Sequence, residues 1–265
     1  MTPFDFFLAI ILVVGLGAWA KREHSRVEQA ISLGSASARL SGYRRVIVVQ
    51  WSLIALLAMH WVLTEREVSA LGLALPLNWR LGVGLLIAAA GTTFLWYQLQ
   101  SVRKNESDRE DARKALRDLE WLLPHNLQEL DSFMRVSVTA GICEEVLYRG
   151  FLAWFFAQWM PFWLAMMLSG VVFGLAHAYQ GRVGVLKTGL IGIAFGGLTL
   201  LSQSIVPAIL LHIAVDALNG QLGYFVISTP RPRMAADAFT DAAPGSDSEG
   251  AEAEPAGPEE EDSQG

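Results

Sequence analysis

Residues 136–158 read VSVTAGICEEVLYRGFLAWFFAQ, a run of membrane-helix length that nevertheless carries Glu144, Glu145 and Arg149. The run can cross a bilayer as a helix, because a hydrocarbon core of about 30 Å needs about 20 mostly apolar residues. A charged side chain at the bilayer centre costs about 2.5 to 3.5 kcal/mol on insertion scales. The stretch therefore predicts a membrane helix whose charged side chains face the interior of a helix bundle.

The whole chain has the composition of a membrane protein. Only 17% of its 265 residues are charged, against about 25% in soluble domains, and 52% are apolar. The mean hydropathy is +0.35. The apolar residues form seven runs, at 4–20, 46–63, 81–99, 136–158, 162–178, 186–201 and 205–227. We therefore expect an all-α fold, a polytopic membrane bundle of about seven transmembrane helices, rather than a soluble enzyme.

The distribution of Lys and Arg predicts the orientation of this bundle. These residues gather in the loops 21–45 and 100–135, whereas the loop 64–80 has only Arg66 and Arg80. Short cytoplasmic loops collect positive charge, so the two basic loops are expected inside. Seven crossings would then leave the N-terminus outside and the C-terminus in the cytoplasm.

The chain is expected to have four parts. They are three N-terminal membrane helices in 1–105, an amphipathic linker at 106–134, a core of four spans in 135–228 and an acidic tail at 229–265. Leucines at helical spacing among charges over 108–130 predict an amphipathic helix on the cytoplasmic surface. Residues 234–265 carry ten acidic and no basic side chains, which leaves 20 basic and 16 acidic residues, or +4, for residues 1–233. The tail composition predicts disorder, and nothing in the chain indicates nucleic-acid binding.

The charged residues of 136–158 fall into two groups by spacing. Glu145 and Arg149 are four residues apart, so they share one face of a helix in the favourable order for an ion pair. Glu144 is rotated about 100° from Glu145 and is left out of that pair. We expect Glu145 and Arg149 to support the helix, and Glu144 to be available for chemistry.

Two later spans carry matching polar stripes. Phe173 and His177 share one helical face, and so do His212 and Asp216, with Asn219 about one turn further on. If Asp216 bonds to His212, it selects which ring nitrogen carries the proton. A single interior cavity would satisfy all these polar groups.

Other functions would use the same polar groups. Polar residues inside membrane helices often only hold helices together, as in a non-catalytic scaffold, and ionisable ones also line proton or ion paths in transporters. A measurement of catalytic activity would separate an enzyme from these alternatives. The remaining histidines, His24, His60 and His125, are expected to be structural or exposed.

The order of the motifs adds a resemblance to this interpretation. The motifs are, in chain order, Glu144-Glu145-x-x-x-Arg149, Phe173-x-x-x-His177 and His212-x-x-x-Asp216. This pattern resembles the CAAX-processing and bacteriocin-processing (CPBP or ABI) family of intramembrane endopeptidases, which includes the type II CAAX prenyl endopeptidases. The resemblance covers about residues 130–225. Asp216 departs from it, because Asn is commoner at that position.

The resemblance implies hydrolysis of a peptide bond in a protein or peptide at the lipid bilayer. It implies that Glu144 and His177 activate a water and that His212, with Asp216, stabilises the oxyanion. No cofactor is then required. The residues leave a zinc set of Glu144, His177 and His212 open as an alternative. Composition favours a prokaryotic inner membrane, and the sequence does not identify the substrate.

Overall fold

The computed structural model describes residues 1–230. Helices form all the regular structure in that part of the chain, and Met1–Thr229 form one compact unit. The all-α fold expected from the sequence is confirmed. The predicted disordered tail lies, beyond residue 230, outside the described residues.

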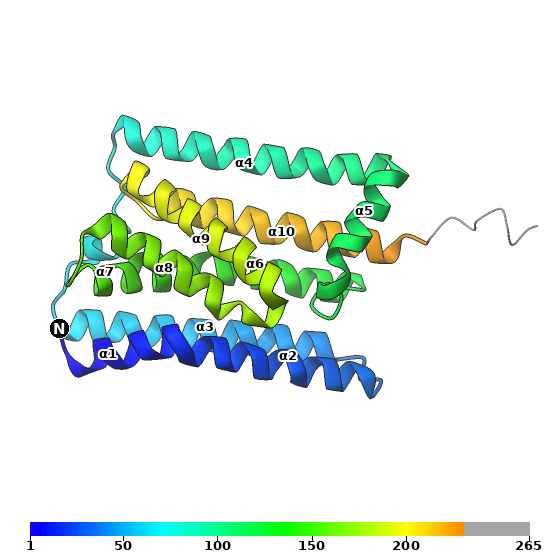
Figure 1. Ribbon diagram of the computed structural model, residues 1–265, viewed down its shortest axis with the longest axis horizontal. Coiled ribbons are helices and arrows are strands. Elements are labelled where there is room, and N and C mark those ends of the chain that lie inside the picture. The colour runs from blue at the N-terminus through cyan, green and yellow to red at the C-terminus, as the bar shows by residue number, and fades with distance from the viewer. Residues whose placement is uncertain (231–265) are drawn as a thin grey trace, which may run out of the picture. The chain divides into compact units, whose positions relative to one another are not determined.

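The N-terminal half consists of long, nearly continuous helices. In chain order they are α1 (Pro3–Ile10), the π-helical η1 (Ile11–Gly15), α2 (Leu16–Ser32), α3 (Ala38–Leu63), the 3-10 turn η2 (Val68–Leu71) and α4 (Trp79–Lys104). Helices α1 and α2 run as one rod beside α3, whereas α4 lies on the far side of the molecule (Figure 1).

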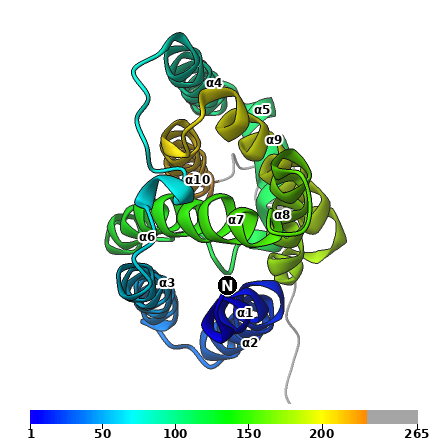
Figure 2. The ribbon, with the colours of Figure 1, turned by 90° about the vertical axis from the view of Figure 1, so that its left-hand side faces the viewer.

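The C-terminal half is built around a central helix. Helix α6 (Leu127–Glu145) continues through the π-helical η4 (Val146–Leu152) into α7 (Ala153–Phe156). It is followed by α8 (Phe162–Ala176), the 3-10 turn η5 (Ala178–Gln180), α9 (Gly181–Ser202) and α10 (Val206–Ser228). Seen along the bundle, α6 and α7 separate α1–α3 from α4 and α10, and α8 and α9 flank them (Figure 2). Residues 145–153 of this central helix are buried.

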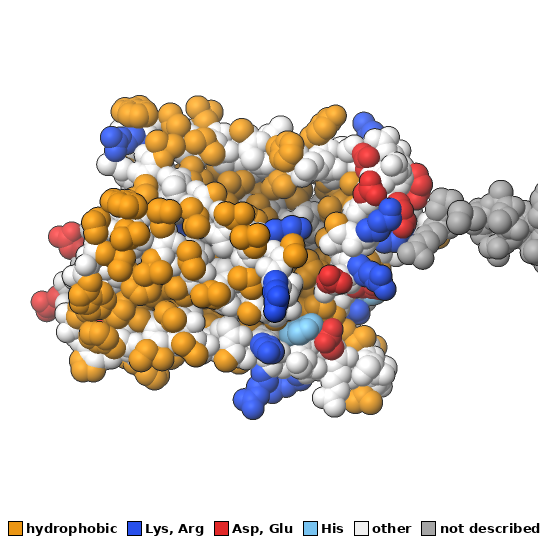
Figure 3. Space-filling view, in the orientation of Figure 1, with side chains coloured by type: hydrophobic (Ala, Val, Ile, Leu, Met, Phe, Trp, Pro, Cys, Tyr) orange, Lys and Arg blue, Asp and Glu red, His pale blue; other side chains and the backbone are white. Residues whose placement is uncertain are grey.

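Five helices are long and apolar enough to cross a membrane. They are Pro3–Ser32, Ala38–Leu63, Trp79–Lys104, Ala178–Ser202 and Val206–Ser228. Helix α8 is apolar but has only 15 residues. Each of the seven predicted runs lies on a helical segment, and the number of crossings stays a prediction. Apolar side chains cover most of one face, whereas charged ones gather at the end where α5 (Glu106–Leu116) lies (Figure 3).

The amphipathic helix expected over 108–130 is divided in two. Helix α5 ends at Leu116, a 3-10 turn η3 (Arg117–Leu119) follows, and α6 begins only at Leu127. Pro124 lacks an N–H group and disfavours helical geometry in the residue before it. Asn126 then caps the new helix, because its side-chain oxygen accepts a hydrogen bond from Glu129 N at 2.9 Å. The prediction of one helix was therefore wrong between 117 and 126.

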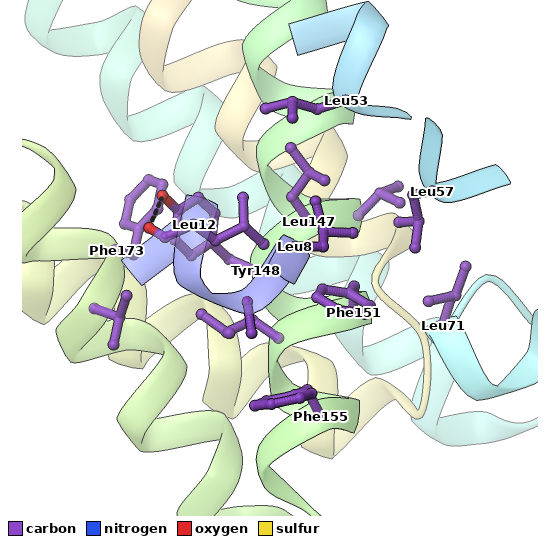
Figure 4. Close-up of a cluster of buried hydrophobic side chains, with 14 of the residues drawn as sticks. Leu8, Leu12, Leu53, Leu57, Leu71, Leu147, Tyr148, Phe151, Phe155 and Phe173 are labelled. Carbon is purple, nitrogen blue, oxygen red and sulfur yellow. Dashed lines mark hydrogen bonds between the residues drawn. The ribbon is translucent and has the colours of Figure 1, made fainter. Parts of the chain in front are cut away.

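Apolar packing joins the N-terminal rod to the charged helix. Leu8 and Leu12 from the rod belong to the same buried cluster as Leu147 and Phe151 (Figure 4). Tyr148 donates a hydrogen bond to the Leu12 carbonyl at 3.4 Å. The segment that follows Glu144 is therefore fixed by side chains distant in sequence.

The histidines outside the motifs have structural contacts. His60 Nε2 lies 3.1 Å from the buried carboxylate of Asp5. His24 Nε2 lies 3.3 Å from Glu28 Oε2, one turn further along α2. His125 contacts a backbone carbonyl in its own loop. All three side chains therefore have partners within the described part of the chain, and His24 also lines a cavity described below.

Candidate active site

The ion pair expected between Glu145 and Arg149 is confirmed, and both side chains are fully buried. Arg149 Nη1 donates to Glu145 Oε1 at 2.9 Å, and Nη2 donates to the Gly192 carbonyl of α9 at 3.0 Å. The guanidinium carbon lies 4.4 Å from the centre of the Phe173 ring. A buried ion pair needs such additional partners to offset the loss of hydration. Arg149 thus connects three helical segments around the charged turn.

Glu144 lies outside this pair, as the spacing predicts. Its Oε1 accepts a hydrogen bond from Gln50 Nε2 of α3 at 2.7 Å, and its Oε2 lies 3.9 Å from His212 Nε2. Gln50 is not among the residues predicted for the site, although it is a polar residue within the apolar run 46–63. Gln50 fixes one carboxylate oxygen of Glu144 and leaves the other facing His212.

His212 is held by Glu145 rather than by Asp216. His212 Nδ1 lies 2.8 Å from Glu145 Oε1, whereas Nε2 lies 3.7 Å from Asp216 Oδ2, beyond hydrogen-bond range. The carboxylate oxygen of Glu145 can only accept, so Nδ1 carries a proton when Glu145 is ionised. Glu145 therefore orients the ring, and the hydrogen bond between Asp216 and His212 considered from the sequence is absent from the described contacts.

His177 lies at the C-terminal end of α8. Its Nδ1 lies 2.8 Å from the Phe173 carbonyl, which can only accept, so Nδ1 is the donor and Nε2 is the free nitrogen of a neutral ring. The Phe173 ring centre lies 4.7 Å from that of His177 and 5.9 Å from that of His212. Phe173 thus packs between the two imidazoles.

Asn219 does not join this group. It is exposed, and none of the described hydrogen bonds connects it to the other motif residues. The structure brings together Glu144, Glu145, Arg149, Phe173, His177, His212 and Asp216.

A cavity of about 100 Å³ reaches this cluster, and Glu144 and His177 form part of its wall. Most of the remaining lining comes from α2, α3 and the loop 120–126 and is largely apolar, with Leu16, Trp19 and Val46 among it. His212 and Asp216 are not among its lining residues, but His212 Nε2 lies 3.9 Å from Glu144 Oε2. The arrangement gives an apolar chain access to a carboxylate and an imidazole.

The zinc alternative depends on how the possible ligands are grouped. Within residues 1–230, no three side chains of His, Cys, Asp or Glu are grouped so that they could hold a metal ion. Both imidazoles have Nδ1 committed to an acceptor of the protein, so Nε2 is the nitrogen of each ring that is open to a further ligand.

The fold and the site define a class: a polytopic helical membrane protein with a buried cluster of Glu and His side by side with an apolar cavity. Residues 126–218 match the family model described as type II CAAX prenyl endopeptidase Rce1-like. This segment runs from the cap of α6 into α10 and contains every motif residue through Asp216. The resemblance inferred from the motifs is confirmed for this domain, and its family is one of membrane-embedded proteases. No curated protein and no solved structure matches the chain.

Proposed function

We propose that this protein is an intramembrane endopeptidase that hydrolyses a peptide bond in a membrane-associated protein or peptide. The observation that carries the proposal is the apolar cavity that ends on Glu144 and His177. The remaining lining suits an apolar peptide segment, and the two polar groups suit the hydrolytic water. The matched family supports the same reaction class.

Glu144 acts as the general base in this proposal. The water oxygen attacks the carbonyl carbon of the scissile bond, and one water proton passes to Glu144. Collapse of the tetrahedral intermediate breaks the C–N bond, and the proton moves to the leaving nitrogen. His177 Nε2, unprotonated in the neutral ring, accepts a hydrogen bond from the water and orients it. Gln50 holds Oε1 and leaves Oε2, the oxygen nearer to His212, to take the proton from the water.

His212 stabilises the oxyanion. Because Nδ1 is committed to Glu145, this role requires a second proton on Nε2, so the active form of His212 is the imidazolium. Glu144 and Asp216, each within 4 Å of Nε2, provide balancing charge. An imidazolium directed at the developing oxyanion is most effective in a water-poor site. Glu145 and Arg149 are positioning residues in this scheme.

The protein is an integral membrane protein, and we propose a prokaryotic inner membrane with the N-terminus outside. The charged side chains gathered near α5 support the proposal that this end of the bundle lies at a membrane surface (Figure 3). The basic loops 21–45 and 100–135 support a cytoplasmic location for that surface.

The test replaces Glu144 by Gln, which keeps the shape but not the base. Protein termini are compared by mass spectrometry in cells that lack the gene and in cells that carry wild type, E144Q or D131N. Asp131 serves as the control because it lies on the same helix and forms an exposed ion pair with Arg135. We expect wild type and D131N to produce the same new termini. The amount of these termini should fall about 10²-fold or more in E144Q.

Two results would contradict the proposal. E144Q that is inserted normally and produces the termini at the wild-type rate excludes Glu144 as the base. Termini that do not depend on the gene, together with pH-dependent ion flux in liposomes, would instead indicate a transporter.

A further inference from the structure

Two arginines from neighbouring helices share one buried carboxylate where α2 packs against α3. Arg26 Nη1 donates to Glu23 Oε2 at 2.8 Å, and Arg45 Nε donates to Glu23 Oε1 at 2.6 Å. The Glu23 side chain is only 6% exposed, whereas those of Arg26 and Arg45 are 55% and 37% exposed. Glu23 thus fixes two guanidinium groups next to each other at the surface.

The close approach of the two helices holds this carboxylate in place. A Cβ atom built on Gly42 of α3 would lie 2.9 Å from Val27 Cγ2 and 3.9 Å from Glu23 Oε1. The absence of a side chain at Gly42 therefore lets α2 pack tightly against α3 at the level of Glu23. The two arginines belong to this helix contact and are not loose surface side chains.

One carboxylate neutralises only one of the two arginines. Within residues 1–230, nothing accepts a hydrogen bond from Arg26 Nη2 or Arg45 Nη1, so each guanidinium keeps a terminal donor group. Arg22 is exposed, has no ion-pair partner in the same part of the chain, and lies one turn before Arg26 on the same face of α2. Arg22, Arg26, Arg45 and Glu23 form the basic cluster, with a net charge of +2.

The nearest carboxylates outside the basic cluster lie on the other side of α2. Glu28 is two residues from Arg26, or about 200° round the helix, and its Oε2 lies 3.3 Å from His24 Nε2. Glu28 and His24 line an open groove together with Asp118 and Glu120, and no arginine of the basic cluster lines that groove. These carboxylates therefore do not cancel the positive charge of the basic cluster.

The basic cluster lies where both helices pass from apolar to charged sequence. In the membrane-length helix Pro3–Ser32, residues 6–20 carry no charged side chain, and Lys21 is the first basic residue. In α3 the last basic residue of this end is Arg45, and residues 46–63 contain no Asp, Glu, Lys or Arg. Val48, one turn from Arg45 toward the apolar part, is 56% exposed. This boundary is the level of lipid headgroups, with an apolar surface beside it for acyl chains.

We propose that Arg26 and Arg45, with Arg22 beside them, bind the phosphate of an anionic phospholipid of the surrounding membrane. Guanidinium groups match phosphate oxygens with parallel hydrogen bonds, and basic pockets between membrane helices bind anionic headgroups. The net charge of +2 favours a headgroup with a negative net charge over a zwitterionic one. Because Glu23 also lines the apolar cavity, the bound lipid stabilises a helix contact that forms part of the cavity wall.

Lipid binding is measured on the full chain in detergent by native mass spectrometry. The probes are dioleoyl phosphatidylglycerol and dioleoyl phosphatidylcholine, which share their acyl chains and their phosphate and differ in net charge. We expect phosphatidylglycerol to bind roughly 20-fold more tightly, because each of two arginines near a membrane surface contributes about fivefold. It should also raise the midpoint of thermal unfolding more than phosphatidylcholine does, since a ligand of the folded state stabilises that state.

Substitutions assign the preference to the basic cluster. R26Q and R45Q should each lower it about fivefold, and each leaves Glu23 paired with the other arginine, so the fold is kept. E23Q/R26Q/R45Q removes all three charges without leaving a buried one unpaired and should retain little of the preference. K104Q is the control, because Lys104 is exposed at the last residue of α4, on the far side of the molecule from α2 and α3 (Figures 1 and 2).

The inference is overturned if the wild type binds both lipids equally, or if R26Q and R45Q keep the full preference. A loss in K104Q as large as in R26Q also overturns it, since the attraction would then be spread over the whole charged surface. The same holds if inorganic phosphate at equal concentration raises the unfolding midpoint as much as phosphatidylglycerol, since the site would then hold a free anion. Lipid binding requires no hydrolysis, so these results are independent of the role of Glu144.

Discussion

Glu145 Oε1 serves two donors, Arg149 Nη1 and His212 Nδ1, and neither donor has another carboxylate within hydrogen-bond range. Glu145→Gln would leave the fully buried Arg149 without its counter-charge. Breaking a buried ion pair from one side costs about 3 to 5 kcal/mol, because the remaining charge stays desolvated. We therefore expect E145Q to lower the free energy of unfolding by about 3 kcal/mol.

Thermal unfolding of the detergent-solubilised protein measures this change. D131N is the matched control, since its exposed ion pair with Arg135 on the same helix should contribute at most about 1 kcal/mol. An E145Q protein as stable as D131N would show that the pair does not support the fold.

At the same scale, the sequence predicts contacts within one helix and fails for contacts between helices. The four-residue spacing of Glu145 and Arg149 is enough to predict their ion pair, because both follow one backbone. The same spacing between His212 and Asp216 brings Nε2 only to 3.7 Å, since Glu145 of another helix takes Nδ1 and turns the ring. Gln50 and Arg39 reach the site only through the packing of α3.

Helices α8 and α9 approach each other more closely than side chains normally allow. A Cβ atom built on Gly174 would lie 2.7 Å from Gly189 Cα and 2.8 Å from the Val185 carbonyl oxygen, and backbone atoms cannot rotate away. His177 follows Gly174 at the end of the same helix. The close packing of these two helices therefore sets the position of His177 on the cavity wall.

We expect Gly174→Ala to push α8 away from α9. The strain should cost about 1 to 3 kcal/mol of stability and reduce the formation of new protein termini in cells. Gly197→Ala in α9 is the control, because a Cβ atom there meets no atom within 4 Å. Thermal unfolding and the terminus comparison are made on both variants. Equal stability and equal formation of new termini in the two variants would rule out a packing role for Gly174.

Hydrophobic periodicity predicts where helices exist but not how they bend. All seven apolar runs lie on helical segments, since long apolar periodic stretches are the strongest sequence signal. The π-helical turn η4 over Val146–Leu152 has no such signal, although it follows directly after Glu145. π-Helical turns occur often at functional sites, and this one is fixed by its packing against the N-terminal rod and α8.

At the scale of the whole molecule, two parts of the chain form the site. The family match, residues 126–218, supplies the motif residues, whereas Leu16, Trp19, Arg39 and Gln50 come from helices before it. The motif residues that gather at the site could therefore be predicted from local spacing, but the cavity could not. Its walls depend on how α2 and α3 dock against α6.

A buried network at the start of α1 contributes to this docking, far from the chemistry. Asp5 is fully buried and accepts from Arg66 Nη1 and Nη2 at 2.7 and 2.8 Å. The Arg66 guanidinium carbon also lies 5.0 Å from the Trp61 ring centre and 4.7 Å from that of Trp154 in α7. These contacts join α1, the end of α3 and α7 at the end of the bundle away from α5 (Figure 1).

Asp5→Asn should therefore lower stability without changing the chemistry. It leaves Arg66 largely buried without a full counter-charge, at a cost of about 3 kcal/mol. The double variant D5N/R66Q removes both charges and should recover part of that loss, because no uncompensated charge remains. Thermal unfolding measures the stability of each protein, and the terminus comparison, made well below the midpoint, measures activity per folded molecule. Activity should match the wild type, since no cavity residue is altered; activity lost at unchanged stability would instead mean that this network acts on the site itself.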